Sequence, residues 1–268
     1  MSRLWRDELR VALTPSALAW ARYGRGFARR GPETGVLPLP AQTDAPAWQP
    51  AIDALAQVLD TAGRVQAAVV LSNHFTRYLV LPKNADITGA SEWEEYARHR
   101  FALAHGPVVQ GWSLRLSADV PKAPRVASGV DAALLAQLRE MFARKHVPLA
   151  SIQPYLMVSF NRFRARFEGK NAWFVSHEPG RLSLGLLRQG AWYSIRNRRA
   201  GADWQAELAG MIDLENELAG LHEPCCEVWL DAVNTDLTAK LGAYSLGNLR
   251  RESSAPIAID PALALVLN

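Results

Sequence analysis

The sequence predicts an α/β protein made of two subdomains of one plan, each with a mixed sheet flanked by helices. Short apolar runs of strand length alternate along the chain with longer segments of helical periodicity. A pattern of strand, turn, strand, glycine turn and strand occurs at 9–30 and again at 172–199, and both copies end in a basic cluster. We therefore expect a duplicated architecture, with a first subdomain over 1–154 that holds an inserted α/β segment and a second over 155–268. The alternative is that two β-meanders arose by chance.

The elements of the first half follow from periodicity and capping patterns. Apolar residues alternate on both sides of a turn at 14–16, which predicts a β-hairpin. Ser91, with Glu94 three residues later, has the capping-box pattern of a helix start, and Asp131 is a second candidate N-cap. The elements expected here are a hairpin over 9–23, a strand within 27–39, helices over 48–59, 91–104 and 131–145, and strands over 67–71, 76–81, 111–117, 125–128 and 149–153.

The second half begins with a helix and continues as a β-meander whose turns contain glycine and proline. Phe160, Phe163 and Phe167 recur at helical spacing, which predicts one stripe that faces the core. The elements expected here are helices over 155–166 and 203–218, strands over 172–176, 181–187, 191–198 and 227–230, a helical turn over 237–241, and a short C-terminal helix from Pro261.

Composition excludes several classes of protein. The chain has 268 residues, of which 49% are hydrophobic and 21% charged, so disordered, collagen-like and coiled-coil classes do not fit. Its formal net charge of +4 is too small to indicate nucleic-acid binding by itself. The apolar runs are too short to span a bilayer, and we expect no signal peptide because charged residues occupy the N-terminus. Adjacent Cys225 and Cys226 cannot form an ordinary disulfide, so we expect a reducing compartment.

Several short motifs together resemble a known superfamily. They are the hairpin at 9–23, the strand-loop-strand of 69–72 and 78–82 that ends in Leu-Pro, the helix start at 93–96, the meander at 172–198 with a glycine turn at Gly190, and the closing 263–265. The set resembles the actin-like superfamily, which has a duplicated, ribonuclease H-like fold and also contains sugar kinases and Hsp70-type chaperones. The details resemble bacterial assembly proteins: the cytoplasmic actin-like protein of type IV pilus assembly and the cytoplasmic part of the actin-like inner-membrane protein of type II secretion.

Nucleotide binding in that superfamily rests on two phosphate hairpins and an adenosine loop, where glycine-rich turns expose N–H groups and acidic residues hold Mg²⁺. The first hairpin turn has neither glycine nor aspartate, and Pro15 removes an N–H donor. The second offers Glu178 and Gly180 but contains another proline, and 230–234 lacks a Gly-Gly pair. We therefore expect a fold retained without ATP hydrolysis. No catalytic, cofactor-binding or metal-binding residue is assigned, and ATP with Mg²⁺ is disfavoured as a cofactor.

Other candidate chemistry has a simpler interpretation. The six histidines form no metal-binding pattern, and Cys225-Cys226 has no second cysteine pair, so we expect buried cysteines beside a strand. Arginines interleave with the phenylalanines of 160–167 as in nucleic-acid binders, but the helical spacing favours a solvated arginine face. The arginines within 196–199 are expected to protect a strand edge. Trp93 and Tyr96 are hypothesised interface residues.

The sequence therefore predicts a non-catalytic cytoplasmic scaffold in a type IV pilus-like or type II secretion-like assembly. Its expected partners are a bitopic membrane-anchored assembly protein, through which it would lie at the inner membrane, and other pilus or secretion components. No nucleic acid is expected, and a homodimer is a further candidate arrangement. Two alternatives stay open: an active actin-like ATPase or small-molecule kinase that uses Glu178, Asp231 and Asp236, and a basic nucleic-acid adaptor with steeply salt-sensitive binding.

Overall fold

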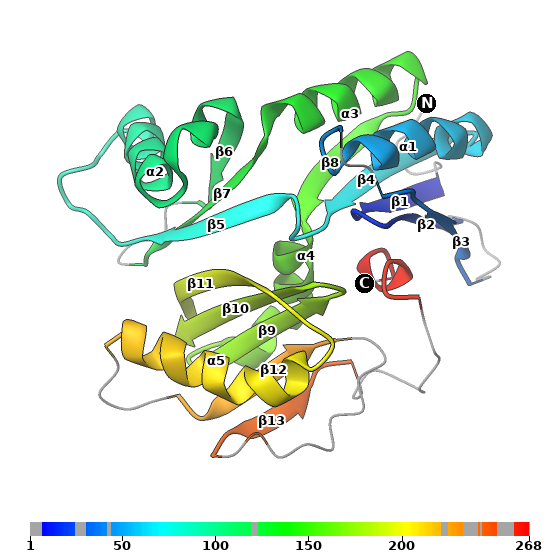
Figure 1. Ribbon diagram of the computed structural model, residues 1–268. Coiled ribbons are helices and arrows are strands. Elements are labelled where there is room, and N and C mark those ends of the chain that lie inside the picture. The colour runs from blue at the N-terminus through cyan, green and yellow to red at the C-terminus, as the bar shows by residue number, and fades with distance from the viewer. Residues whose placement is uncertain are drawn as a thin grey trace. The chain divides into compact units, whose positions relative to one another are not determined.

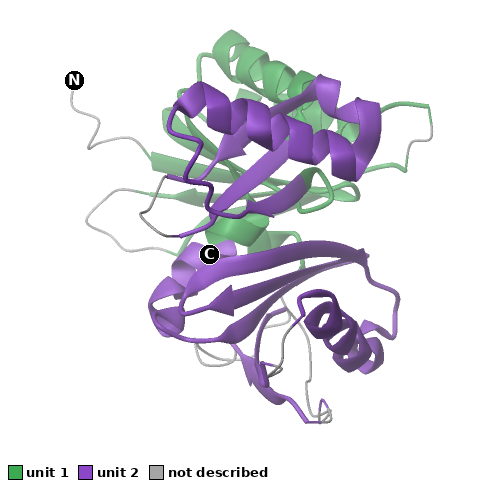
Figure 2. Ribbon diagram, turned by 90° about the vertical axis from the view of Figure 1, so that its left-hand side faces the viewer, with its two compact units in different colours: residues 1–76, 130–158, 259–268 green, residues 77–129, 159–258 purple. Residues whose placement is uncertain are grey.

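The computed structural model describes residues 7–24, 31–41, 44–118, 123–220, 225–232, 241, 243–250 and 260–267 (Figure 1). The chain divides into two compact units, which Figure 2 colours separately. Unit 1 comprises 1–76, 130–158 and 259–268, and unit 2 comprises 77–129 and 159–258. The two units are defined by contacts in space. These contacts place the inserted segment, residues 77–129, in the same unit as residues 159–258 of the second half. The boundary at 154/155, which follows the internal repeat, stays a prediction.

Unit 1 is built on a five-stranded mixed sheet in the order β3-β2-β1-β4-β8. The first three strands form an antiparallel meander, whereas β1, β4 and β8 run parallel to one another. The strands are β1 (Asp7–Leu13), β2 (Ala17–Tyr23), β3 (Glu33–Pro38), β4 (Val65–Leu71) and β8 (Leu149–Pro154), and the helices are α1 (Gln49–Thr61) and α3 (Ala132–Arg144). These elements confirm the strands and helices that periodicity predicts for this part of the chain.

Different segments cover the two faces of this sheet, as Figure 1 shows. Alternate residues of β1, from Leu9 to Leu13, pack with the apolar faces of α1 and α3. On the other face, Ala12 lies in a cluster with Tyr155 and with Leu265 near the C-terminus. The C-terminal segment therefore completes the core of unit 1. It forms a single 3₁₀ turn, η5 (Leu263–Leu265), where the sequence predicts a short helix.

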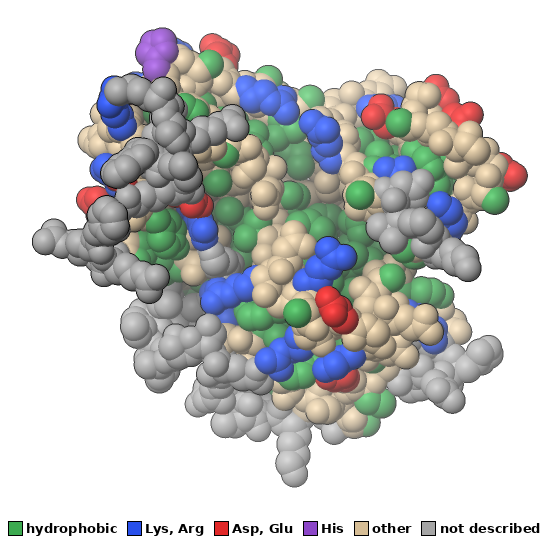
Figure 3. Space-filling model, turned by 180° about the vertical axis from the view of Figure 1, so that it is seen from behind, with side chains coloured by type: hydrophobic (Ala, Val, Ile, Leu, Met, Phe, Trp, Pro, Cys, Tyr) green, Lys and Arg blue, Asp and Glu red, His purple; other side chains and the backbone are tan. Residues whose placement is uncertain are grey.

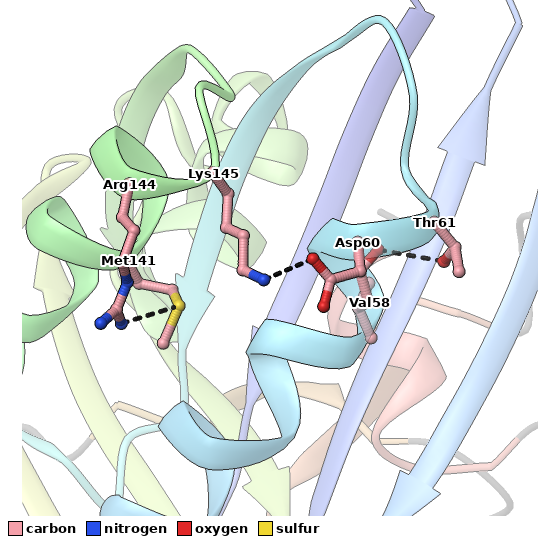
Figure 4. A network of polar contacts seen from close by, with 6 residues as sticks. All are labelled: Val58, Asp60, Thr61, Met141, Arg144 and Lys145. Atoms are coloured by element: carbon pink, nitrogen blue, oxygen red, sulfur yellow. Dashed lines mark hydrogen bonds and ion pairs between the residues drawn. The ribbon is translucent and has the colours of Figure 1, made fainter.

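Polar contacts fix the two helices of unit 1 to each other. Lys145, which directly follows α3, forms an ion pair with Asp60 near the end of α1 (Figure 4). Asp131 accepts the N–H of Ala133 at 2.8 Å, which confirms its predicted role as the N-cap of α3. Its second oxygen accepts a hydrogen bond from Nε1 of Trp48 at 3.1 Å. One carboxylate thus ties the start of α3 to the start of α1.

A three-stranded sheet in the order β5-β7-β6 forms the first part of unit 2. Its elements are β5 (Thr76–Leu81), α2 (Ala90–His105), the 3₁₀ helix η2 (Gly106–Gly111), β6 (Trp112–Leu116) and β7 (Arg125–Asp131). Trp93, Ala97 and Phe101 of α2 pack against Leu81 and Ala127 of the sheet. Because Trp93 is only 2% exposed, the hypothesis that it is an interface residue is wrong. Its ring belongs to the core.

The predicted capping box of α2 is wrong in its position. The helix begins directly after Gly89, two residues before the predicted Ser91 cap, and Glu92 takes the place of Glu94. The Glu92 carboxylate accepts the N–H groups of Thr88 and Gly89 at 2.9 and 3.0 Å. These backbone hydrogen bonds lower the pKa of Glu92. The spacing of three residues is the same in both pairs, so the pattern alone does not distinguish them.

The second part of unit 2 is a five-stranded sheet in the order β11-β10-β9-β12-β13. The strands are β9 (Ala172–Glu178), β10 (Arg181–Arg188), β11 (Ala191–Arg199), β12 (Glu227–Asp231) and β13 (Ser245–Asn248); the helices are α4 (Tyr155–Phe163), η3 (Arg164–Phe167) and α5 (Trp204–Leu218). One face of the sheet, with Trp173, Leu184 and Val228, packs against Leu208 and Ile212 of α5.

An aromatic cluster covers the opposite face of this sheet. The Phe160 ring contacts those of Phe167, Phe174 and Trp192, and the Phe174 ring also contacts those of Phe167 and Trp192, with ring centroids 4.4 to 6.2 Å apart. A glycine is required beneath the cluster, because a Cβ on Gly185 would lie 2.2 Å from the Trp192 ring. The core-facing stripe that the phenylalanine spacing predicts is confirmed for Phe160 and Phe167, which are both buried, whereas Phe163 is only partly buried and lies outside this cluster.

The two five-stranded sheets share one plan. Each consists of an antiparallel meander, whose first strand runs parallel to a fourth strand, followed by a fifth strand parallel to the fourth. This confirms the mixed α/β fold of two similar halves. The sequence did not predict β13. Most of the helical turn expected at 237–241, and residues 27–30 of the expected third strand, lie outside the described residues.

Candidate functional site

The turn between β1 and β2 closes on its own polar groups. The N–H of buried Thr14 donates to the carbonyl of Ala17 at 3.0 Å. The Thr14 Oγ1 accepts the N–H of Ala17 at 2.9 Å and donates to the Ala17 carbonyl at 2.8 Å. Since Pro15 has no N–H, these bonds leave Ser16 as the one residue of this turn whose N–H could meet a phosphate oxygen.

The turn between β9 and β10 has two residues, Pro179 and Gly180. Glu178 and Arg181 pair across it, and Gly180 adopts φ 78°, the left-handed conformation that favours glycine. The Gly180 carbonyl accepts the N–H of Ala200 at 3.2 Å. Burial lowers the pKa of Arg181, while the charge of Glu178 raises it. The turn thus places its buried carboxylate near an arginine.

Asp231 ends β12, at the position where the resemblance places an adenosine loop. The side chain is fully buried, and its two oxygens accept hydrogen bonds from Ser159 Oγ and from Arg250 Nε. Arg250 is mostly buried as well, so the contact is an ion pair largely removed from water. Both oxygens of this carboxylate are therefore engaged by the chain itself. Asp236, the third candidate carboxylate, lies outside the described residues.

The structure brings the other two candidate carboxylates to one face of the sheet. Asp231 pairs in register with Ser176 of β9, and Glu178 follows Ser176 by two residues. Ser183 of β10 pairs with Ser176 from the other side, so a buried polar row crosses three strands. Ser176 Oγ has no hydrogen-bond partner among the described residues. The row has the polarity to orient a small ligand, but an arginine stands near each carboxylate.

Sequence reasoning missed Ser72 and Asn73, which follow β4. Both are fully buried. Asn73 Oδ1 accepts the N–H of Leu156 at 3.1 Å, which satisfies a donor in the first turn of α4. Ser72 Oγ accepts the N–H of His74 at 3.1 Å. The available signal was a pair of polar residues directly after an apolar strand. The structure explains Asn73 as support for the start of α4 and Ser72 as support for the turn after β4.

Histidine and cysteine form no metal site with acidic residues in the part of the chain that the structure describes. His177 stacks on Trp204 with ring centroids 4.3 Å apart, and burial lowers the pKa of His177 to about 4. It is therefore neutral at physiological pH. Cys225 is half-buried, but Cys226 is exposed, so the expectation of two buried cysteines is wrong for Cys226.

The arginines near the aromatic cluster make local contacts. Arg166 lies over the Trp229 ring at 4.4 Å, and Arg162 lies over the Phe163 ring at 5.3 Å. Figure 3 shows one face of the molecule, on which Lys and Arg side chains are mixed with hydrophobic and acidic ones. This arrangement differs from the continuous basic stripe that favours nucleic-acid binding.

No known family model matches the chain, and no curated protein matches it in sequence. Solved structures do match. A chain of a PilM-PilN type IV pilus biogenesis complex has a TM-score of 0.64 at 14% identity, over 98% of this chain and 97% of that one. A Bacteroides thetaiotaomicron protein with an actin-like ATPase fold and unknown function has a TM-score of 0.61 at 8% identity, over 99% and 98%. The cytoplasmic domain of EpsL, an inner-membrane component of the Vibrio cholerae type II secretion system, has a TM-score of 0.56 at 10% identity, over 97% and 92%.

These similarities show that the chain has an actin-like fold over nearly its whole length, as the sequence resemblance predicts. At identities of 8 to 14% they show the fold alone. Among the helices of the described residues, none has the length and apolar character needed to cross a bilayer.

Proposed function

We propose that the chain is a scaffold protein of a bacterial envelope assembly, of the type IV pilus or type II secretion kind, and that it acts without ATP hydrolysis. The fold similarity to a chain of the PilM-PilN complex and to the cytoplasmic domain of EpsL supports the class of role. One observation carries the rest of the proposal: at the described candidate positions, Thr14 and Ala17 close the first turn by hydrogen bonds to each other, and the Asp231 carboxylate is paired with Arg250.

A phosphate site needs backbone N–H groups that point at the ligand. In the first turn, Thr14 and Ala17 use their N–H groups on each other, and Pro15 has none. The second turn contains Pro179, and the buried Asp231 is neutralised by Arg250. A Mg²⁺ ion would have to displace that arginine to reach the carboxylate. The described residues therefore support a fold that is complete without nucleotide.

The proposed partners are proteins. A bitopic membrane-anchored component would hold the chain at the cytoplasmic face of the inner membrane, and further components of the machine would bind to other surfaces. The mixed charge of the face in Figure 3 supports protein partners over nucleic acid. A homodimer is compatible with this arrangement.

Titration calorimetry and thermal melts with Mg-ATP test the non-catalytic part. A nucleotide present at a thousand times its Kd would stabilise the fold by about 4 kcal/mol and raise the Tm. We expect no heat beyond dilution, no shift in Tm and no release of phosphate. Micromolar binding, or turnover that the Glu178→Gln variant abolishes, would instead establish the ATPase or kinase alternative.

Cell fractionation tests the assembly part. In the organism that encodes the chain, a tagged copy is followed in membrane and soluble fractions, with and without the gene for the candidate bitopic partner. We expect membrane association that disappears when the partner is deleted. A chain that stays soluble in both strains, or stays on the membrane in both, contradicts the proposal.

A further inference from the structure

We propose that the edge strand β11 and the adjoining flank of α5 form a docking surface for an extended, acidic and apolar segment of a partner protein. The surface, called the β11–α5 surface below, consists of Tyr193, Ser194, Arg196, Leu214 and Leu218. All five residues belong to unit 2. The inference rests on the scaffold role proposed above, and it names one binding surface and the chemistry of its partner.

The apolar part of this surface is exposed to water. Leu218 is 63% exposed and Leu214 is 47% exposed, whereas Leu208 on the core side of the same helix is fully buried. The two exposed leucines are four residues apart, so they are neighbours on one flank of α5. Tyr193, at 43% exposed, reaches the end of that helix, where its hydroxyl donates to the Ala219 carbonyl at 3.3 Å. Adjoining apolar groups of this kind mark interaction sites.

A hollow of about 320 Å³ lies beside these residues. It is lined by Tyr193, Ser194 and Arg196 of β11, by Leu218 of α5, and by Val80 and Pro82 at the end of β5. Its volume is at the lower end of the range for small-ligand pockets, which suits one or two side chains of a peptide. Ser194 Oγ is buried there and has no hydrogen-bond partner among the described residues.

The charge of the surface selects an acidic occupant. Buried Glu215 of α5 accepts a hydrogen bond from Arg198 Nε at 3.2 Å, and Arg196 Nε lies 3.4 Å from its other oxygen. One carboxylate thus faces two partly exposed guanidinium groups, which leaves a net positive charge. Arg188 adds another guanidinium over the Tyr193 ring, 5.6 Å from its centroid. Carboxylates on a partner can pair with the open sides of these arginines.

The other carboxylates of this part of α5 point elsewhere. Asp213 and Glu217 directly precede the two exposed leucines, so they lie about 100° around the helix from them. Asp213 accepts a hydrogen bond from the Tyr244 hydroxyl, which holds it on that other side. The positive charge beside the hollow is therefore not balanced from within the helix.

The position of β11 favours an extended occupant. Among the described strands, β11 pairs with β10 alone and ends the sheet, as the predicted edge protection by arginines requires. The outer edge of such a strand offers backbone groups to which an extended segment can add. Its arginines oppose the addition of a basic segment and favour an acidic one. Addition along β11 would bring the side chains of the segment to the hollow.

A second copy of this chain is a poorer occupant of the same edge. Antiparallel pairing of β11 with itself would place two arginine-rich strands side by side, and like charges on paired strands are destabilising. We therefore assign the surface to a segment of a different chain.

Peptide selection on the purified chain tests the proposal. A random phage-displayed peptide library is selected on the immobilised protein, and an enriched peptide is synthesised with a fluorescent label for polarisation titrations. We expect enriched peptides to combine Asp or Glu with aromatic or branched apolar residues. Their affinity should fall as salt rises, because ion pairs contribute to binding.

Matched variants locate the binding surface. Leu218→Asp and Arg196→Glu should each weaken peptide binding about tenfold or more, as expected for central contacts. Leu103→Asp is the control, because Leu103 on α2 is 71% exposed and lies outside the surface. Thermal melts check that each variant folds. A second charge variant, Arg188→Glu, does not remove either arginine that contacts Glu215. Arg188→Glu should also weaken binding.

Three results would overturn the proposal: no enriched peptide, enriched peptides without acidic residues, or binding that Leu218→Asp and Arg188→Glu leave unchanged. A dimer in light scattering that Leu218→Asp dissociates would assign the surface to a second copy instead. These outcomes are separate from the scaffold role, because ATP turnover or a failure of partner-dependent membrane association would refute that role without changing the peptide result.

Discussion

Replacing Trp93 by alanine should destabilise unit 2 strongly, because its indole ring fills the core between α2 and the three-stranded sheet. The ring packs edge-on against Tyr96, with centroids 5.9 Å apart, and the Arg125 guanidinium lies 5.1 Å from its centroid. Truncation of a buried aromatic residue costs about 3–5 kcal/mol, through lost transfer free energy and the cavity that remains. We expect the free energy of unfolding to fall by an amount in that range.

Urea unfolding followed by far-ultraviolet circular dichroism measures the loss. Trp93→Phe is the matched variant, since it keeps most of the ring and removes Nε1, which is buried without a hydrogen-bond partner among the described residues. It should cost about 1.5 kcal/mol or less. Leu103→Ala, at an exposed site on the same helix, should change stability by about 0.5 kcal/mol at most. Equal losses for Trp93→Ala and Leu103→Ala would refute the core position of Trp93.

Two further predictions concern buried polar groups. Asp231→Asn removes the charge that Arg250 pairs with in a mostly buried site and should cost about 3–5 kcal/mol in urea unfolding; a loss near zero would show that the pair does not hold β12. Burial lowers the pKa of His177 to about 4, so between about pH 6.5 and 4 the unfolded chain takes up a proton that the folded chain does not. Stability should therefore fall as pH drops through this window, and His177→Phe should reduce the fall when urea midpoints near pH 7 and pH 5 are compared. An identical fall in both proteins would contradict this assignment.

Elements whose signal lies within one segment could be predicted from the sequence. Leu134, Leu138 and Phe142 recur at helical spacing, and all three are buried on the face of α3 that packs in unit 1. The second meander was recognisable because its strands are separated by short turns with glycine at Gly180 and Gly190. Both glycines adopt positive φ, at 78° each. Local conformational preference and burial agree in these elements, so pattern and structure coincide.

Features that depend on distant pairing could not be predicted in this way. The strand β13 has the sequence Ser-Leu-Gly-Asn, which has no strand pattern of its own. Its pairing with β12 places Gly247 beneath the Trp229 ring, where a Cβ would lie 2.3 Å from the ring. The same pairing brings Arg250 to Asp231, 19 residues earlier in the sequence. The sequence places Trp93 at an interface, whereas the structure places it in the core. The helical pattern of α2 does not show which aromatic residue of the helix packs against the sheet.

The candidate nucleotide turns were predictable in composition and not in bonding. Pro15 and Pro179 are visible in the sequence, and each removes an N–H donor from a turn. The hydrogen bonds between Thr14 and Ala17 require the turn geometry itself. The sequence also could not show that Asp231 has an arginine partner. That partner, Arg250, directly follows the β13 region, and the pairing of β13 with β12 is not visible in the sequence. Composition thus indicated the prolines of the turns, and the structure shows the contacts that Thr14 and Asp231 make.

The two similar halves differ in the third strand of each antiparallel meander, which lies at the edge of its sheet. In unit 1 this strand is β3. Its Leu37 packs against the apolar cluster on one face of the sheet, and its Val36 packs against the cluster on the opposite face. In unit 2 the corresponding strand is β11, where Arg196 and Arg198 meet a buried glutamate and remain partly exposed. A strand that served only to close its sheet would be expected to carry apolar residues there, as β3 does. The basic clusters that end both copies of the sequence pattern thus differ in position: Arg196 and Arg198 lie within β11, whereas residues 29–30 precede β3 and lie outside the described residues. This difference between the two edge strands is why we place partner binding at the edge of the second half.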